Sequence, residues 1–293
     1  MTTSEQKQPV TAMVFAVSAM ACFAVLDTSN KFLIASVPLL MVLWFRYLFQ
    51  AVVTTAVMWP RRGMTMFQTH SYKLQLIRGL LLLICSILGF ASLQRMPVAE
   101  FSAIAMLTPL VVTILARFVM KEHVSRLRWM FVVGGLFGAL LIVRPGGSLQ
   151  FNVAWLPLVM VFSYAIFQTI TSHMAKTENP VTMHIYTGWV GTAIASVLVL
   201  GHWTTDLTSF QWLLMCVIGF AGTLGHYLLI MAFSRAPASN VTPFLYSSIA
   251  FATLAGWVVF SHIPDLFATL GMLLIAACGI GAAWLSQREQ TIS

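Results

Sequence analysis

The sequence is poor in charged residues. Only 8% of its 293 residues are Asp, Glu, Lys or Arg, whereas 59% are hydrophobic. A soluble domain carries about 25% charged residues, most of them on its surface. Eight acidic and sixteen basic residues cannot give a chain of this length a water-facing surface. The composition therefore excludes a soluble globular protein and predicts that most of the surface faces lipid.

The motifs of catalysis and of ATP use are also missing. The sequence has no G-x-x-x-x-G-K-[ST] loop, which excludes ATP as the energy source of this chain. It has no H-E-x-x-H, no C-x-x-C, no cluster of histidines and no G-x-S-x-G. We therefore expect no enzyme, no cofactor and no metal. A membrane-embedded enzyme would need such a constellation, and a scaffold or sensor would need a soluble domain that no segment is long enough to form.

Cysteine and basic residues are present, but neither forms a functional pattern. The four cysteines lie singly inside apolar runs, which is typical of small packing residues. The net charge of +8 comes from basic residues in short loops rather than from a basic patch interleaved with aromatics. This distribution excludes a nucleic-acid partner and is typical of membrane proteins.

Ten apolar runs follow one another along the chain. Each is close to the ~20 residues that a helix needs to cross a bilayer. Strands of a membrane barrel would be about 10 residues long with alternating polarity, and these runs are apolar on both faces. The predicted fold class is an all-α integral membrane protein with ten transmembrane helices. The predicted spans are about 11–34, 38–59, 74–94, 98–119, 127–144, 153–174, 180–200, 210–233, 238–260 and 265–285.

Lysine and arginine predict the orientation of these spans. With the N-terminus inside, ten Lys and Arg fall on inside segments, and two, Arg95 and Arg144, fall outside. Basic residues concentrate in short cytoplasmic loops. The bias predicts a multi-pass protein of the bacterial inner membrane with both termini in the cytoplasm and short tails at 1–10 and 288–293.

The chain contains an internal repeat. Residues 92–99 resemble 232–239, residues 23–28 resemble 164–169, and Val37-Pro38 corresponds to Asn179-Pro180, so the offset is 140 to 142 throughout. The predicted units are 11–146 and 152–287, with five helices each. Because five is odd, the two units cross the membrane in opposite directions. Inverted repeats around a site at the membrane midplane are typical of secondary transporters.

Several short motifs accompany the repeat. They are Asp27-Thr28-Ser29-Asn30-Lys31, Phe45-Arg46-Tyr47, Arg78-Gly79, and Thr108-Pro109 followed by Lys121-Glu122. Together with ten helices and a five-helix duplication, they resemble the drug/metabolite transporter superfamily in its EamA-type branch. Lys121 stands where that family usually has Gly, and His262 stands where it often has Glu.

The resemblance implies a secondary transporter that works by alternating access. It favours export of amino acids or related metabolites. Import of a vitamin or nucleoside-like metabolite, such as riboflavin or S-adenosylmethionine, is the alternative. The implied partners are the lipid bilayer and a small-molecule substrate, with protons as a candidate coupling ion.

Charged residues within the predicted spans are the first candidates for a substrate site. Asp27 and Arg46 each lie about seven residues from the outer end of their run, which places them at similar depth. Lys31 follows Asp27 at i+4 on the same face. A charge in hydrocarbon costs at least ~2.5–3.5 kcal/mol, so we expect Asp27 to pair with Arg46, Lys31 or both. Such a cluster is either a structural clamp or a site for a polar or zwitterionic substrate or a proton. Lys31 by itself favours snorkelling to the interface.

A polar stripe in the second unit is the second candidate. Tyr164, Gln168 and Thr171 lie at i, i+4 and i+7 on one helical face, and Gln168 is the repeat counterpart of Asp27. Polar side chains inside spans often bond neighbouring helices, but the equivalent position favours a cavity lining. Further candidates for the lining are Trp44, His226, Tyr227, Asn240 and Tyr246. For His226 alone, packing is the better interpretation.

The remaining polar and glycine motifs have simpler interpretations. Arg78 and Arg117 lie near cytoplasmic helix ends, where snorkelling is expected. Glu122 lies beside basic neighbours and predicts a loop ion pair. The G-x-x-x-G of Gly134 and Gly138 predicts close helix packing, as do Gly271, Gly279 and Gly281, and a homodimer face is the open alternative.

Overall fold

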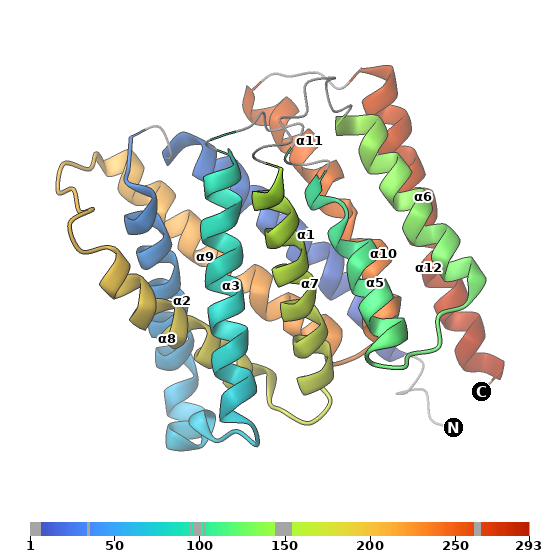
Figure 1. The fold of residues 1–293 in the computed structure, drawn as a ribbon, viewed down its shortest axis with the longest axis horizontal. Helices are drawn as coiled ribbons and strands as arrows, with labels where there is room; N and C mark the ends of the chain where they lie inside the picture. Colours follow the sequence, from blue (N-terminus) through green and yellow to red (C-terminus); the bar gives the residue numbers. More distant parts are fainter. Residues whose placement is uncertain are drawn as a thin grey trace.

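The computed structural model of the chain is a bundle of helices (Figure 1). It describes residues 7–33, 36–93, 95, 101, 104–143, 154–260 and 265–292, and these contain no strand. Helices of the first half are α1 (Lys7–Leu33), α2 (Leu39–Arg62), α3 (Tyr72–Leu93), α5 (Thr108–Phe118) and α6 (Arg126–Val143), with a 3-10 helix η1 (Gly63–Phe67) after α2. Helices of the second half are α7 (Trp155–Met174), α8 (Pro180–Leu198), α9 (Ser209–Phe233), α10 (Ala238–Leu245), α11 (Ser247–Phe260) and α12 (Leu266–Ile292).

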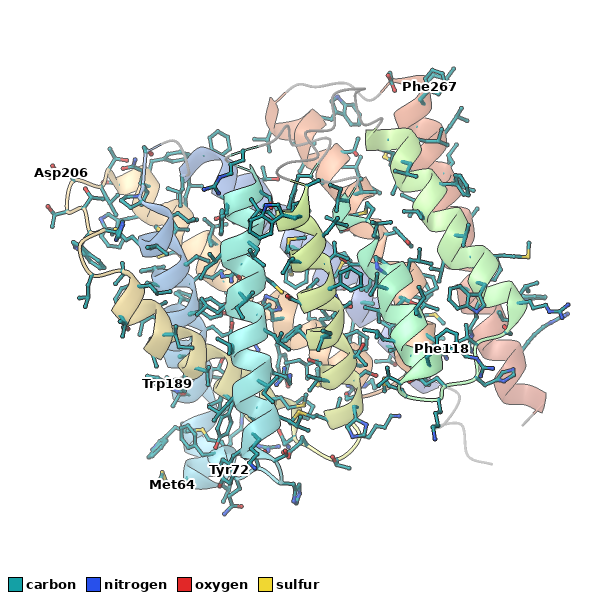
Figure 2. All side chains as sticks on the ribbon, in the orientation of Figure 1. Met64, Tyr72, Phe118, Trp189, Asp206 and Phe267 are labelled. Atoms are coloured by element: carbon teal, nitrogen blue, oxygen red, sulfur yellow. The ribbon has the colours of Figure 1, made fainter. Side chains whose placement is uncertain are left out.

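The two ends of the bundle are named by the chain termini. Both termini lie at the bottom of Figure 1, which we call the lower end, and α1 runs from there to the upper end. Met64 and Tyr72 mark the lower end in Figure 2, and Asp206 and Phe267 mark the upper end. Long apolar side chains such as Phe118 and Trp189 are exposed. An apolar exterior of this kind is what a lipid-facing bundle requires.

Membrane-spanning helices are present in the described residues. Seven helical segments are long and apolar enough to cross a bilayer, and they coincide with predicted runs. Two further apolar segments, Thr108–Phe118 and Thr269–Ala282, are shorter.

Two predicted spans are broken helices, which corrects the prediction of continuous ones. The run 98–119 has a turn at Met106 and Leu107 before α5 begins, and the run 238–260 is interrupted at Tyr246 between α10 and α11. Pro109 in the first turn of α5 lacks the N–H that would continue the hydrogen-bond ladder across the first break, and Pro243 lies inside α10 shortly before the second. Met106 and Tyr246 are 140 residues apart, the repeat offset. Discontinuous helices at matching positions of two halves are typical of secondary transporters.

The packing of the helices follows the same repeat. In the first half α3 packs on α7 and α8, and in the second half α9 packs on α1 and α2. The two arrangements are equivalent, because exchanging the first half with the second converts one into the other. Helix α2 packs on its counterpart α8, and α6 packs on α12. The described helices therefore support two structural repeats whose faces meet in the middle of the bundle.

The pair α6 and α12 stands at one edge of the bundle (Figure 1). A Cβ added at Gly138 would lie 2.9 Å from the carbonyl oxygen of Gly271, and a Cβ at Gly281 would lie 2.4 Å from the ring of Phe131. At Gly279 a Cβ would make ordinary contact. Packing through glycine is confirmed at Gly138, Gly271 and Gly281, since only a hydrogen fits there.

Candidate functional site

The upper part of the bundle holds an exposed carboxylate within a membrane-spanning helix. The Asp27 side chain is exposed, although its helix α1 packs against α9, α10, α11 and α12. Arg46 of α2 and Tyr164 of α7 are half-buried, and both interact electrostatically with Asp27. Three helices thus direct polar side chains to one place. We call Asp27, Arg46 and Tyr164 the upper cluster.

Arg46 is held by α3 rather than by Asp27. Its Nη2 donates a hydrogen bond of 2.6 Å to Ser86 Oγ, and its guanidinium carbon lies 4.7 Å from the centre of the Tyr47 ring. The Tyr47 hydroxyl lies 3.1 Å from the same Ser86 Oγ. Arg46 therefore acts on Asp27 only through its charge in the described structure. The side chain of Lys31 lies outside the described residues, so its pairing with Asp27 stays a prediction.

An aromatic layer lies next to the upper cluster. Tyr164 stacks on Phe167 with ring centres 5.8 Å apart. The buried His226 lies between Phe23 at 4.8 Å and Phe167 at 6.4 Å. These contacts favour the packing interpretation of His226. They also place aromatic faces beside the accessible carboxylate.

The polar stripe of α7 divides between two environments. Tyr164 belongs to the upper cluster, whereas Gln168 and Thr171 are buried. Gln168 Oε1 has no hydrogen-bond partner among the described residues. Thr171 Oγ1 donates to the Phe167 carbonyl at 2.7 Å and accepts from Arg78. The stripe therefore connects the accessible upper part to a dry lower part.

Arg78 is fully buried, which shows that the snorkelling prediction was wrong. Its Nε donates to Thr171 Oγ1 at 2.9 Å, and its Nη1 donates to Gln75 Oε1 at 3.0 Å and to the Met183 carbonyl at 3.2 Å. Its guanidinium carbon lies 5.2 Å from the centre of the Phe167 ring. A guanidinium in this environment is stable because α7 and α8 supply acceptors. Arg117, in contrast, is exposed as snorkelling predicts.

Gln50 and His184 extend this buried polar region. Gln50 Nε2 donates to the His184 carbonyl at 3.0 Å and lies 3.3 Å from His184 Nδ1. The His184 ring lies 5.7 Å from that of Tyr227. We call Gln50, Arg78, Thr171 and His184 the lower cluster. The polar character of Gln50 and His184 inside apolar runs was the signal that could have identified them.

The other predicted residues lie apart from the upper cluster. Trp44 Nε1 donates to Ser196 Oγ at 2.8 Å on α8, and its ring lies 5.3 Å from Trp203. Asn240 is half-buried on α10. The Tyr246 ring is buried against Gly135 of α6. The predicted set thus separates into several places along the bundle.

Two carboxylates at the lower end bind helix N-termini. Glu178 Oε1 accepts hydrogen bonds from Thr69 Oγ1 at 2.8 Å, His70 N at 2.7 Å and Ser71 N at 3.2 Å, directly before α3. The positive end of a helix dipole favours a carboxylate there.

Glu122 makes the equivalent contact with α10. Its carboxylate accepts from Ala238 N at 3.3 Å and Ser239 N at 3.1 Å. This corrects the predicted loop ion pair, since its partners are backbone N–H groups. The preceding Lys121 has φ +56°, a left-handed conformation that glycine adopts without strain. This conformation explains why Gly was expected at that position, while His262 lies outside the described residues.

Comparison with known proteins identifies the family. The model of the EamA-like transporter family matches residues 10–144 and again 152–284. The chain belongs to the EamA-like transporter family. The protein is therefore a multi-pass membrane transporter of the drug/metabolite transporter superfamily, as the sequence motifs predicted. A solved crystal structure of 14% identity superimposes with a TM-score of 0.83 over 94% of this chain and 98% of its own, which shows a shared fold.

Curated relatives of this EamA-like transporter differ in what they carry. An S-adenosylmethionine uptake transporter of Rickettsia bellii is 26% identical over 85% of each chain. A riboflavin transporter of Vibrio cholerae is 29% identical over 66% of this chain and 64% of its own. The pseudopaline exporter CntI of Pseudomonas aeruginosa is 24% identical over 91% and 94%. Within the described residues, no group of His, Cys, Asp or Glu could hold a metal ion.

Proposed function

We propose that this protein is a secondary transporter of a small zwitterionic metabolite whose cationic group binds at Asp27. The observation that supports this most directly is the exposed Asp27 carboxylate on a helix packed in the middle of the bundle. A carboxylate inside a membrane protein is costly unless a partner compensates it. Arg46 donates its hydrogen bond to Ser86 rather than to Asp27, which leaves the Asp27 carboxylate able to bind a substrate cation.

The aromatic layer supports the same substrate class. Tyr164 and Phe23 are half-buried aromatic residues at this site, and the buried Phe167 stacks behind Tyr164. Aromatic faces attract cations and stack on flat rings. An amino acid with a cationic or ring-bearing side chain combines these features. Arg46 is the residue that would orient the carboxylate of such a substrate.

The proposed architecture is that of an inner-membrane transporter with ten transmembrane helices and both termini in the cytoplasm. Its units are the two inverted repeats 11–146 and 152–287, which exchange conformations to give alternating access. Basic residues at the end of α2 and at the start of α6 lie at the lower end, which supports placing that end in the cytoplasm. The family favours export of amino acids or related metabolites as the direction.

Uptake is the second candidate direction. Relatives from Rickettsia that are 25–27% identical are named S-adenosylmethionine uptake transporters. S-adenosylmethionine joins a cationic sulfur and an amino-acid group to a flat ring, which is the chemistry that the upper cluster favours. Counterflow in proteoliposomes loaded on either side distinguishes the two directions.

A binding screen followed by transport tests the proposal. Detergent-purified protein is melted with amino acids, S-adenosylmethionine, riboflavin and metallophores, since a ligand of the folded state raises Tm by mass action. We expect a cationic or zwitterionic class to raise Tm by several degrees, and Asp27→Asn to abolish the shift while Asp206→Asn, an exposed control, preserves it. Normal transport by the Asp27→Asn protein in proteoliposomes would overturn the assignment. A pH gradient across the same vesicles tests proton coupling.

A further inference from the structure

The charged contacts at the lower end connect one repeat to the other. Glu178 belongs to the turn between α7 and α8 of the second repeat, and it binds the N-terminal residues of α3 in the first. Arg78 belongs to α3 and bonds Thr171 of α7 and the Met183 carbonyl of α8. Each repeat thus sends one charged side chain into the other. The charge of Glu178 also acts on Arg78.

Glu122 repeats the arrangement on the other side of the bundle. It belongs to the turn after α5 of the first repeat and binds Ala238 and Ser239 at the start of α10 in the second. Hydrogen bonds from backbone N–H groups to a carboxylate are roughly twice as strong as neutral ones. At the lower end, therefore, a carboxylate of each repeat caps a helix of the other repeat.

The positions at the upper end that match Glu178 and Arg78 carry no charge. The offset of 142 between Val37-Pro38 and Asn179-Pro180 maps Glu178 onto Ser36, and the offset of 140 maps Arg78 onto Ile218. Ser36 Oγ accepts a hydrogen bond of 2.8 Å from Gln211 Nε2 in the first turn of α9, the counterpart of α3. Ile218 is buried. The repeat places a neutral contact where the lower end has charged ones.

We propose that Glu178 and Arg78 are positioning residues of a lower gate, which keeps the lower end closed in the substrate-free protein while Asp27 stays accessible. The inference rests on the proposed secondary transport. A cavity of about 670 Å³ lies at the lower end of the bundle, below this gate. Residues that include Arg62, Lys176 and Glu178 line it. Glu178 lines this cavity, whereas Arg78 lies on the buried side of the gate, within the lower cluster. Opening moves the start of α3 away from Glu178, and water then solvates both.

Thiol labelling measures the state of each end. Cys22, Cys85, Cys216 and Cys278 are first replaced by alanine. Ser172→Cys on α7, next to Thr171 and fully buried, reports on the lower gate. Thr28→Cys on α1, next to Asp27 and half-buried, reports on the upper part. Each is reacted with a water-soluble maleimide without substrate, so that the readout does not depend on knowing the ligand.

We expect Glu178→Gln to raise the labelling rate at position 172 roughly tenfold and to lower it at position 28. The glutamine keeps an acceptor oxygen but removes the charge that strengthens three hydrogen bonds, and a weakening of this size shifts a two-state equilibrium by about that factor. Asp206→Asn, which removes an exposed carboxylate at the upper end, is the matched control and leaves both rates unchanged. Unchanged rates in Glu178→Gln, or fast labelling at position 172 in the parent, overturn the gate.

A second substitution keeps the test independent of folding defects. Arg78→Lys retains the positive charge but loses the forked geometry that reaches α7 and α8 together. We expect it to raise the labelling rate at position 172 in protein that elutes as a single species on size exclusion. An unchanged rate would overturn the proposal of a lower gate. Because labelling needs no substrate, absence of transport in proteoliposomes would overturn the proposed function and leave the labelling result intact.

Discussion

Arg78 and Asp27 both lie inside membrane-spanning helices, yet their surroundings are opposite. Arg78 is fully buried and donates three hydrogen bonds to partners on α3, α7 and α8. Asp27 is exposed and interacts with Arg46 through charge alone in the described residues. A buried ion needs several hydrogen bonds to offset its desolvation. The contrast teaches that the lower charges bond one repeat to the other, whereas the upper one is exposed and makes no such bond among the described residues.

The largest expected effect on stability is at Arg78. Replacing it by Leu leaves Gln75 Oε1 and the Met183 carbonyl without this donor in a dry environment. Losing bonds of this kind costs about 3 kcal/mol or more, which corresponds to a Tm lower by roughly 5–10 °C. Melting of detergent-purified protein measures it. Arg61→Leu, at an exposed position of the same end, should stay near the parent Tm, and equal losses in both would remove the contrast.

A smaller loss is expected at Gln50, which connects α2 to α8. Gln50→Leu keeps a similar volume but removes the donor to the His184 carbonyl and the contact with its ring. We expect a cost of about 1–2 kcal/mol. Gln68→Leu changes an exposed glutamine and provides the control. If Gln50→Leu has the same Tm as that control, the lower cluster does not stabilise the packing of α2 on α8.

The upper part should lose less from a comparable change. Trp44→Phe keeps the ring near Trp203 but removes the hydrogen bond to Ser196 Oγ. Because Trp44 is half-buried and water can replace this bond, we expect about 0.5–1 kcal/mol. A double-mutant cycle with Ser196→Ala isolates the pair. A coupling free energy above ~2 kcal/mol between Trp44 and Ser196 would show that the upper end is also strongly stabilised by contacts between helices.

The smallest effect on stability is expected at Asp27, the residue that we propose binds the substrate. Asp27→Asn should change the free energy of unfolding by less than ~0.5 kcal/mol, since the carboxylate is exposed and interacts with Arg46 through charge alone in the described residues. Chemical denaturation and transport are measured on the same protein. A destabilisation as large as that of Arg78→Leu would show that Asp27 is a structural clamp between α1 and α2.

Much of the fold was predictable from residue patterns. Apolar runs of about 20 residues placed the membrane helices because hydrocarbon requires every backbone group to be bonded within the helix. The matching Val37-Pro38 and Asn179-Pro180 turns revealed the repeat, which the exchange of packing between α3 and α9 supports. The breaks at Met106 and Tyr246 were not predicted. Both lie inside apolar runs, and a hydrophobicity pattern does not show where the hydrogen bonds of a helix are interrupted.

The sequence alone determined that this chain is an apolar helical bundle with an internal repeat and the motifs of a metabolite transporter. Composition, span length and repeat offset can each be recognised directly in the order of the residues. Tertiary structure decided what the individual charges do. Arg78 and Glu122 looked like surface residues near helix ends, but their partners, such as Met183 and Ser239, lie more than a hundred residues away. Only the packing of one repeat against the other brings such acceptors and donors together, and this packing determines which charges are buried and which are free to bind.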